Sequence, residues 1–370
     1  MIHLAALEIK KYRHICLLFL SLIVCASLFA QEKKVSLLFA GDAMQHTRQL
    51  DAAKTVDGYD YSSYFQHVKD EIQAADISVV NLETTLPGKN YSGFPLFGSP
   101  DAFAFSLKDA GFDIFLTANN HCVDKGKKGI ERTIAMLDSM QVKHLGTYTT
   151  RAKKELSYPL MVVKNGIRIA MLNYTYDTNG LEIPSPNVVN VTSRKQILKD
   201  IELCKIMKAD IIVANMHWGI EYKLKQSKAQ ESLADFLIEH GVRLVIGSHP
   251  HVVQPLDIRR NKDSIENVVV YSMGNFVSGM KVVNTDGGML VKIELSKKDK
   301  DSAVTIDNCS YSLVFVHKPI ENGRAVYQLI PVEKWNNDKG KEKLGADVFQ
   351  KMQVFYNNAK EAIESLRNKQ

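Results

Sequence analysis

Short apolar runs, each ending in side chains that bind metals or move protons, recur along this chain. Seven of them lie at 35–40, 77–80, 114–116, 169–172, 211–213, 244–246 and 268–270. Runs of this length are typical of buried strands in a parallel sheet. Because ligands of α/β proteins bind just beyond the carboxyl ends of such strands, the sequence predicts one site assembled from loops along most of the chain.

Segments with helical spacing of apolar residues lie between these runs. They cover 62–74, 102–110, 129–139, 193–208 and 228–240. Alternation of strands and helices indicates a mainly parallel sheet covered by helices, which is the α/β class. Several later strands follow one another without room for a helix, so we expect a layered α/β/α or α/β/β/α sandwich.

The character of the chain changes after residue 296. A polar stretch leads to an aromatic strand at 311–317, another at 325–332 and a final helix near 346–367. We therefore expect one main domain at 31–296 and a C-terminal α+β extension at 297–370 that packs on it.

The first 30 residues predict export. Lys10, Lys11 and Arg13 precede an uncharged run at 15–30, which is shorter than the ~20 residues of a membrane-spanning helix. A basic segment followed by a short apolar segment and a small residue is typical of a secretory signal peptide, and an uncleaved N-terminal anchor is the alternative. We expect the protein to be exported and to work in the periplasm or in association with the cell envelope.

The charge pattern argues against a nucleic-acid partner. The net charge of +6 is spread over 47 basic and 41 acidic residues, and the densest basic stretch, at 297–300, contains an aspartate. A nucleic-acid-binding face needs clustered basic residues with aromatic or motif support, and the sequence shows neither.

Two loops carry histidines suited to metal binding. In His249-Pro250-His251 the imidazoles are two residues apart, so an extended backbone points both to the same side. Imidazole binds zinc, manganese, iron and neighbouring metals. His217 ends another apolar run, and nearby Glu221 either orients an imidazole or is simply a solvated charge.

Asp42 and Glu83 each follow an apolar run and supply carboxylates. Burying two carboxylates is costly unless they are paired or bind metal. Two divalent ions that share a carboxylate would offset this cost and activate a water molecule between them. The alternatives are a turn-capping role for Asp42 and a helix N-terminal charge for Glu83.

The sequence Asn119-Asn120-His121, followed by Asp124, has the composition of a strand-to-helix turn. An amide oxygen can bind a metal, and the imidazole beside it can donate a proton to a leaving group. Asparagine also tolerates left-handed backbone, so a purely structural role is the alternative. Cys122 is a weaker candidate for a thiol nucleophile.

Six motifs stand at the ends of predicted strands. They are Gly41-Asp42, Asn81-Leu82-Glu83, Asn119-Asn120-His121, His217-Trp218-Gly219, His249-Pro250-His251 and Tyr271-Ser272-Met273-Gly274-Asn275. In combination they resemble the CapA family, the bacterial capsule or poly-γ-glutamate synthesis proteins, whose PGA_cap domain is related to calcineurin-like metallophosphatases. The resemblance covers roughly residues 35–295.

This resemblance implies a four-layer α/β/β/α sandwich of metallophosphatase type with a centre for two divalent metal ions, of manganese, zinc or iron. The residues that would bind them are Asp42, Glu83, Asn120, His217, His249 and His251. In that family pattern Asp42 binds the first metal and Glu83 bridges both. Asn120 and His217 bind the second metal, and the last two histidines bind one metal each.

The resemblance also implies roles beside the metals. His121 would be the proton donor, with Asp124 as the next candidate. Side chains expected to support the ligands or to meet the substrate are Asn81, Asn119, Tyr174, Asn179, Glu221 and Asn275.

Two positions depart from the phosphatase pattern. Glu83 stands where those enzymes use aspartate, and Met44 stands two residues after Asp42, where they use a histidine ligand. Either His46 takes the place of that histidine, or the first metal site is weak.

The expected function is therefore a metal-dependent hydrolase that acts on an envelope polymer or its precursor, beside membrane-bound polymer synthesis machinery. The bond could be a phosphoester or an amide such as a γ-glutamyl bond. One alternative is a non-catalytic envelope protein that helps to export or tether the polymer. Another is a secreted phosphoesterase unrelated to capsule.

Overall fold

A computed structural model describes residues 32–366 of the chain, except 300 and 322. The predicted signal peptide or anchor at 1–30 lies outside the described residues. Within them, no helix combines the length and the apolar character needed to cross a membrane.

Each of the seven apolar runs forms a strand. They are β1 (Lys33–Ala43), β2 (Ile77–Leu82), β3 (Ile114–Leu116), β7 (Ile167–Thr175), β9 (Ile211–His217), β10 (Leu244–Ser248) and β12 (Ser264–Val270). β1, β2 and β3 pair in parallel, and so do β7, β9, β10 and β12. Within each group the carboxyl ends of the strands therefore meet at one edge, as predicted.

Two long strands join these groups. β14 (Gly287–Lys297) runs antiparallel to β1, and β15 (Thr305–His317) pairs with β14 and, through Ile306, with β12. Among the described residues the result is a 14-stranded sheet in the order β4-β3-β2-β1-β14-β15-β12-β10-β9-β7-β6, with β11, β13 and β18 paired beside this path. These further strands are β4 (Lys143–Leu145), β6 (Leu160–Lys164), β11 (Leu256–Asn261), β13 (Asn275–Val277) and β18 (Gln328–Pro331).

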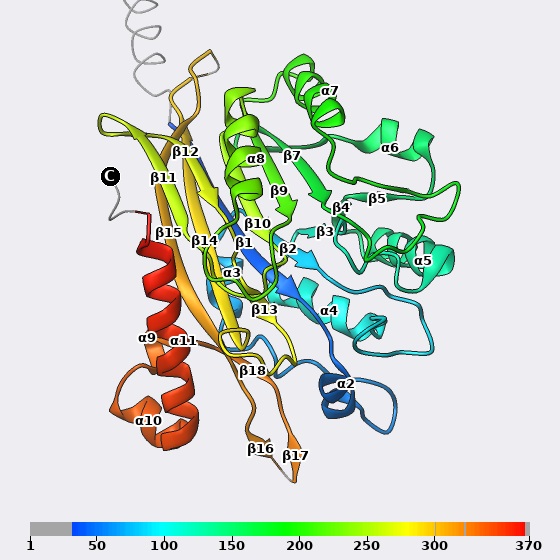
Figure 1. The fold of residues 1–370 in the computed structure, drawn as a ribbon, viewed down its shortest axis with the longest axis vertical. Coiled ribbons are helices and arrows are strands. Elements are labelled where there is room, and N and C mark those ends of the chain that lie inside the picture. Colours follow the sequence, from blue (N-terminus) through cyan, green and yellow to red (C-terminus); the bar gives the residue numbers. More distant parts are fainter. Residues whose placement is uncertain (1–31, 300, 322, 367–370) are drawn as a thin grey trace, which may run out of the picture.

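Alternating side chains of β1 separate two apolar cores. Leu37 and Phe39 pack in a core with residues of β7, β9, β10 and helices α7 (Arg194–Ile206) and α8 (Lys228–Glu239). Leu38 and Ala40 pack on the opposite face with α3 (Lys69–Gln73), α4 (Asp101–Ala110) and α5 (Gly126–Ser139). The two halves of the sheet thus lie face to face between two helical layers, the predicted α/β/β/α sandwich (Figure 1).

The remaining elements are short or lie at the C-terminus. They are α2 (Thr47–Ala53), α6 (Arg151–Ser157), α9 (Val332–Trp335), α10 (Asp338–Leu344), α11 (Ala346–Glu364), and the two-stranded pairs β5 (Thr147–Tyr148) with β8 (Val188–Val189) and β16 (Ile320–Glu321) with β17 (Arg324–Ala325).

The helix predicted at 62–74 is only the five residues of α3. Before it, the chain makes successive turns in which Tyr64 N donates to Tyr61 O and Val68 N donates to Phe65 O. Hydrogen bonds between residues three apart give the same apolar spacing as a helix. The pattern therefore identified the buried residues correctly but not the helix length.

The C-terminal segment is more closely integrated than an added extension. β15 lies between β14 and β12 in the sheet order, so residues after 297 join its two halves. α11 packs against β15, with the Phe355 and Phe315 rings 6.1 Å apart. The predicted boundary at 296/297 falls at the end of β14, within this continuous sheet.

Candidate metal centre

The strand ends bring the predicted carboxylates and histidines together in the interior. Two groups have ligand atoms that all lie within 4.8 Å of one another: Asp42, Glu83 and His217 form one, and Glu83, His249 and His251 form the other. They come from the ends of β1, β2, β9 and β10, and all are buried. Glu83 belongs to both groups.

One oxygen of the buried Glu83 carboxylate has no hydrogen-bond partner. This oxygen, Oε1, lies 3.6 Å from His217 Nε2 and 3.9 Å from His251 Nε2. Burial, and then the negative charge of Asp42, raise the pKa of Glu83 well above its ordinary value. An isolated buried carboxylate is costly, so the site favours either a proton or a cation at this position.

Asp42 is held as a charged acceptor. Burial opposes its charge, but the hydrogen bond and the electrostatic interaction with His251 prevail and lower the pKa of Asp42. Its carboxylate accepts hydrogen bonds from Asn81 Nδ2 at 2.7 Å and from His249 N at 3.2 Å, and lies 3.1 Å from His251 Nδ1. Adjacent Asp42 and Glu83 thus favour opposite protonation states in the metal-free protein.

Two of the histidines are held in the neutral form that binds metals. Burial, and then neighbouring His249, lower the pKa of His217 well below its ordinary value. Burial and His251 lower the pKa of His249 to about 3, and its Nδ1 has no hydrogen-bond partner. Metal ligands must be deprotonated, so these imidazoles are ready to bind without losing a proton.

These donors fit a divalent metal. Carboxylate oxygens and neutral imidazoles are ligands of zinc, manganese and iron. The two buried atoms without partners, Glu83 Oε1 and His249 Nδ1, lie in the same cluster and would gain a partner from a bound ion.

The pKa of Glu83 gives a pH-dependent stability. A group whose pKa is raised on folding stabilises the protein below its unfolded pKa and loses that contribution as the pH rises through the folded pKa. We therefore expect metal-free Glu83→Gln to become progressively more stable than metal-free wild type above pH 4.5, by at most about 1.4 kcal/mol per pH unit. Urea unfolding of both proteins at several pH values measures this difference, and a difference independent of pH would contradict the assignment.

Backbone geometry is unusual at the histidine pair. His249 and His251 have positive φ angles of 98° and 60°. Such angles are uncommon outside glycine and cluster at functional sites, where the surrounding structure imposes them. With this backbone, a ligand atom of each imidazole lies within 4.8 Å of Glu83.

Gly41 permits the close approach that positions Asp42. A Cβ at Gly41 would lie 1.9 Å from Gly274 O, the same oxygen that accepts a hydrogen bond from Asp42 N at 3.0 Å. We expect Gly41→Ala to destabilise the protein by about 1–3 kcal/mol, because backbone must move, and to weaken metal binding. Thermal unfolding and metal titration check this, and wild-type values in both would show that Asp42 does not depend on this packing.

His121 and Asp124 form a second pair beside the centre. His121 Nδ1 lies 2.8 Å from Asp124 Oδ2, which also accepts a hydrogen bond from Phe97 N at 2.6 Å. Both side chains are buried. The arrangement fixes the imidazole and leaves Nε2 available to a substrate, as a general acid requires. Burial raises the pKa of the adjacent Cys122 thiol to about 12, which argues against a cysteine nucleophile.

Amide side chains lie around the centre. Asn120 Oδ1 lies 2.9 Å from His217 Nε2, and Asn120 Nδ2 donates to Asn179 Oδ1 at 3.1 Å. Asn119 donates to Leu82 O at 2.8 Å, which ties this turn to the end of β2. Asn275 Oδ1 lies 3.1 Å from His251 Nδ1.

Three predicted positions lie differently from the rest. Tyr174 does not face the centre, because its hydroxyl donates to Asp200 of α7 at 2.7 Å in the apolar core. His46 is in neither ligand group, and its Nδ1 accepts a hydrogen bond from Gly279 N at 3.1 Å. Glu221 is partly exposed, and its charge raises the pKa of Glu83, so it lies near the rim.

Other residues at the centre were not predicted. The Tyr176 ring lies 4.5 Å from that of His249, and Ser248 Oγ lies 2.9 Å from His217 Nδ1. The Phe97 ring lies between His121 at 4.6 Å and His46 at 5.0 Å. No spacing rule in the sequence distinguished these residues from their neighbours.

Comparison with known proteins agrees with the geometry. Residues 36–280 match the family described as "Bacterial capsule synthesis protein PGA_cap". The chain belongs to this family.

Among PGA_cap relatives, the capsule biosynthesis protein CapA of Bacillus anthracis is 28% identical over 288 residues, which cover 74% of this chain and 66% of that protein. The PGA biosynthesis protein CapA of Bacillus subtilis (strain 168) is 30% identical over 274 residues, which cover 71% of this chain and 68% of that protein. The chain therefore matches about two thirds of the length of these relatives.

Solved structures with a similar arrangement include the calcineurin-like phosphoesterase YfkN of Bacillus subtilis, with 14% identity and a TM-score of 0.47 over 87% of this chain and 99% of that one. The NAD nucleotidase of Haemophilus influenzae has 13% identity and a TM-score of 0.49 over 90% of this chain and 64% of that one. Similarity this distant carries no information about chemistry.

Proposed function

We propose that this PGA_cap protein is an exported, metal-dependent hydrolase that acts on an envelope polymer or its precursor. The observation that carries the proposal is the shared position of Glu83, whose Oε1 lacks a hydrogen bond and which belongs to both groups of candidate ligands. A carboxylate shared by two sets of ligands is the arrangement used by two-metal hydrolases.

The residues of the two groups would hold the metals. Asp42, Glu83, His217, His249 and His251 would be the ligands, with Glu83 shared between the two groups and Asn120 Oδ1 beside His217. Bound divalent ions lower the pKa of water and polarise the bond that is cleaved.

His121 would supply the proton for the leaving group. Its Nδ1 lies 2.8 Å from Asp124 Oδ2, and this contact fixes the orientation of the ring. The Phe97 ring packs edge-on against the His121 ring, with their centroids 4.6 Å apart. Asp124 thus acts through His121 and not as a separate acid.

The substrate class follows from family membership and from the names of the relatives. CapA of Bacillus subtilis is named for PGA biosynthesis and that of Bacillus anthracis for capsule biosynthesis. We propose a polymer of this kind, or its precursor, as substrate, and membrane-bound synthesis machinery as partner. Phosphoester and amide bonds are both compatible with the donor set.

A direct test compares hydrolysis by metal-loaded and chelated protein. Purified protein loaded with manganese, zinc or iron is assayed on aryl phosphates, phosphodiesters and γ-glutamyl anilides, and Glu83→Gln is the control. We expect turnover of one bond class that chelation and the variant both abolish. Turnover that survives both chelation and the Glu83→Gln substitution would show that hydrolysis does not depend on this metal centre.

A non-catalytic role in polymer export or tethering has one observation in its favour. Met44, at the position where phosphatases use a histidine ligand, is buried, and His46 is hydrogen-bonded to Gly279. If this weakens the first metal site, the protein would bind one metal and show no turnover in the same assay.

Export predicts a specific N-terminus. We expect the mature protein to begin near Gln31 and to be recovered in the periplasmic or envelope fraction, because the apolar run before it is too short to span a membrane comfortably. Mass spectrometry of the protein purified from its native host measures this. An intact N-terminus in the membrane pellet would indicate the anchor.

A further inference from the structure

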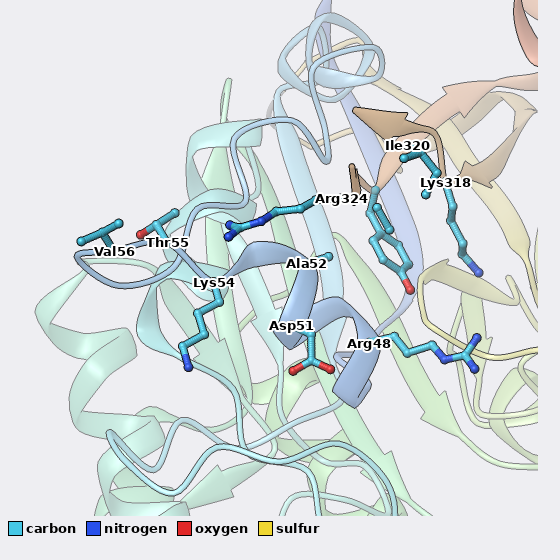
Figure 2. A pocket seen from close by; sticks show the side chains of 11 residues that line it. Arg48, Asp51, Ala52, Lys54, Thr55, Val56, Lys318, Ile320 and Arg324 are labelled. Carbon is cyan, nitrogen blue, oxygen red and sulfur yellow. The ribbon is translucent and has the colours of Figure 1, made fainter. Parts of the chain in front are cut away.

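A basic groove lies near the metal centre, at the surface formed by α2, residues 280–286, the segment from β15 to β17, and α11. It consists of two adjoining pockets of about 750 and 860 Å³ that share Lys318. Its cations are Arg48, Lys54, Lys281, Lys318, Arg324 and Lys351. Figure 2 shows Arg48 and Lys318 converging on one side of the first pocket, with Arg324 reaching over α2.

The six cations of the basic groove form no ion pairs with its aspartates. Among the described residues none of the six forms an ion pair, whereas Lys69, Arg132 and Arg259 pair with aspartates elsewhere on the surface. Burial, and then the charges of Arg48 and other groove cations, lower the pKa of Lys318, although Asp286 opposes this. Unpaired like charges held close together repel each other, and a bound anion would relieve that repulsion.

Acidic residues do not neutralise the basic groove. Three aspartates line it, Asp51 in the first pocket and Asp286 and Asp347 in the second, against six cations. Apolar side chains lie between the charges, among them Ile320, which is 70% exposed, and Val56, which is fully exposed. Alternating charged and apolar surface matches a ligand that carries anionic groups on an aliphatic chain.

A short chain of contacts links the basic groove to the metal centre. Met280 lines the second pocket, and its Sδ lies 3.5 Å from Asn275 Nδ2, while Asn275 Oδ1 lies 3.1 Å from His251 Nδ1. Gly279 donates to His46, which directly precedes α2 and Arg48. A strand in the groove would therefore pass close to the proposed reaction centre.

We propose that the basic groove binds a linear polymer that carries carboxylates on an aliphatic backbone, and that it holds one strand beside the metal centre. Arg48, Lys318 and Arg324 engage the carboxylates, and the apolar surface between them receives the methylene groups. This inference rests on the proposed function, because the groove would bind the proposed polymer substrate. Binding itself does not depend on hydrolysis.

The test measures binding in the metal-free protein, so that it is independent of hydrolysis. Fluorescently labelled poly-γ-glutamate is titrated with wild type and with the triple variant Arg48→Gln, Lys318→Gln, Arg324→Gln. The matched control is Lys128→Gln, Lys195→Gln, Lys262→Gln, which removes the same charge from exposed lysines outside the basic groove. Polyphosphate and duplex DNA of equal charge serve as competing polymers.

We expect the groove variant to bind poly-γ-glutamate roughly tenfold or more weakly than wild type, and the control variant within about twofold of it. Equal weakening of polymer binding in both variants would show that only the net charge of the protein matters. Wild-type affinity in the groove variant would show that the basic groove does not bind the polymer. Tighter binding of polyphosphate or DNA, with the same dependence on the groove residues, would overturn the assignment to a polycarboxylate. If metal-loaded wild type hydrolyses no substrate while metal-free wild type still binds poly-γ-glutamate through the groove residues, the proposed hydrolase function would be wrong and the binding site would stand.

Discussion

Glu83→Gln is expected to lose nearly all bound metal while keeping its fold. Both candidate ligand groups contain Glu83, so one substitution removes a charged donor from each. Removing residues that merely support ligands typically costs 10–100-fold in metal affinity, so we expect a loss of at least about a hundredfold. Elemental analysis and metal titration measure it. Because the raised pKa of Glu83 favours a neutral carboxyl in the metal-free protein, the neutral amide should leave metal-free stability intact or raise it.

Glu221→Gln is the matched control for this experiment. Glu221 carries the same charge at the rim of the centre but belongs to neither ligand group. The Glu221→Gln variant should keep its metal, and its affinity for the metal should fall only modestly because of the change in local charge. If both variants retained wild-type metal content, the shared role of Glu83 would be wrong.

His121→Gln is expected to lose turnover without losing metal. A positioned general acid contributes roughly 10²–10⁴-fold in rate, and the loss should appear with a poor leaving group that needs the proton. A substrate with a good leaving group should be affected much less. Turnover of both substrates, together with metal content and melting temperature, measures the effect.

Two further variants locate the proton donor. Asp124→Asn should show a smaller loss than His121→Gln on the poor leaving group, because Asp124 orients the imidazole and does not itself reach the substrate. Asn120→Ala should harm both substrates alike, because its oxygen lies 2.9 Å from His217 Nε2. Loss of metal in His121→Gln would make His121 a ligand, and full activity on both substrates would place the donor elsewhere.

The strands were predictable because their apolar runs are short, buried on both sides and bounded by polar clusters. What the sequence could not provide was their order. β15 lies between β14 and β12, and local periodicity carries no information about such long-range pairing. The α3 region shows the converse limit, since turns and helices space apolar residues alike.

The clustering of the candidate ligands was predictable because metal-binding side chains at strand ends have few other uses. Tyr174 and Tyr176 show where that reasoning stops. β7 ends at Thr175, and Tyr174 hydrogen-bonds to α7, while Tyr176 lies beyond the strand and its ring meets His249. Which of two nearby tyrosines faces the site depends on where the strand ends, and element boundaries are the least certain part of a sequence-based prediction.

The most direct test of the metal centre is an anomalous diffraction map from crystals grown with manganese. We expect anomalous density within bonding distance of Glu83, between His217 on one side and His249 with His251 on the other. Loss of that density in Glu83→Gln crystals would confirm the shared ligand. Crystals with saturating manganese but no density among these side chains, or with density only elsewhere, would contradict a metal centre at these strand ends.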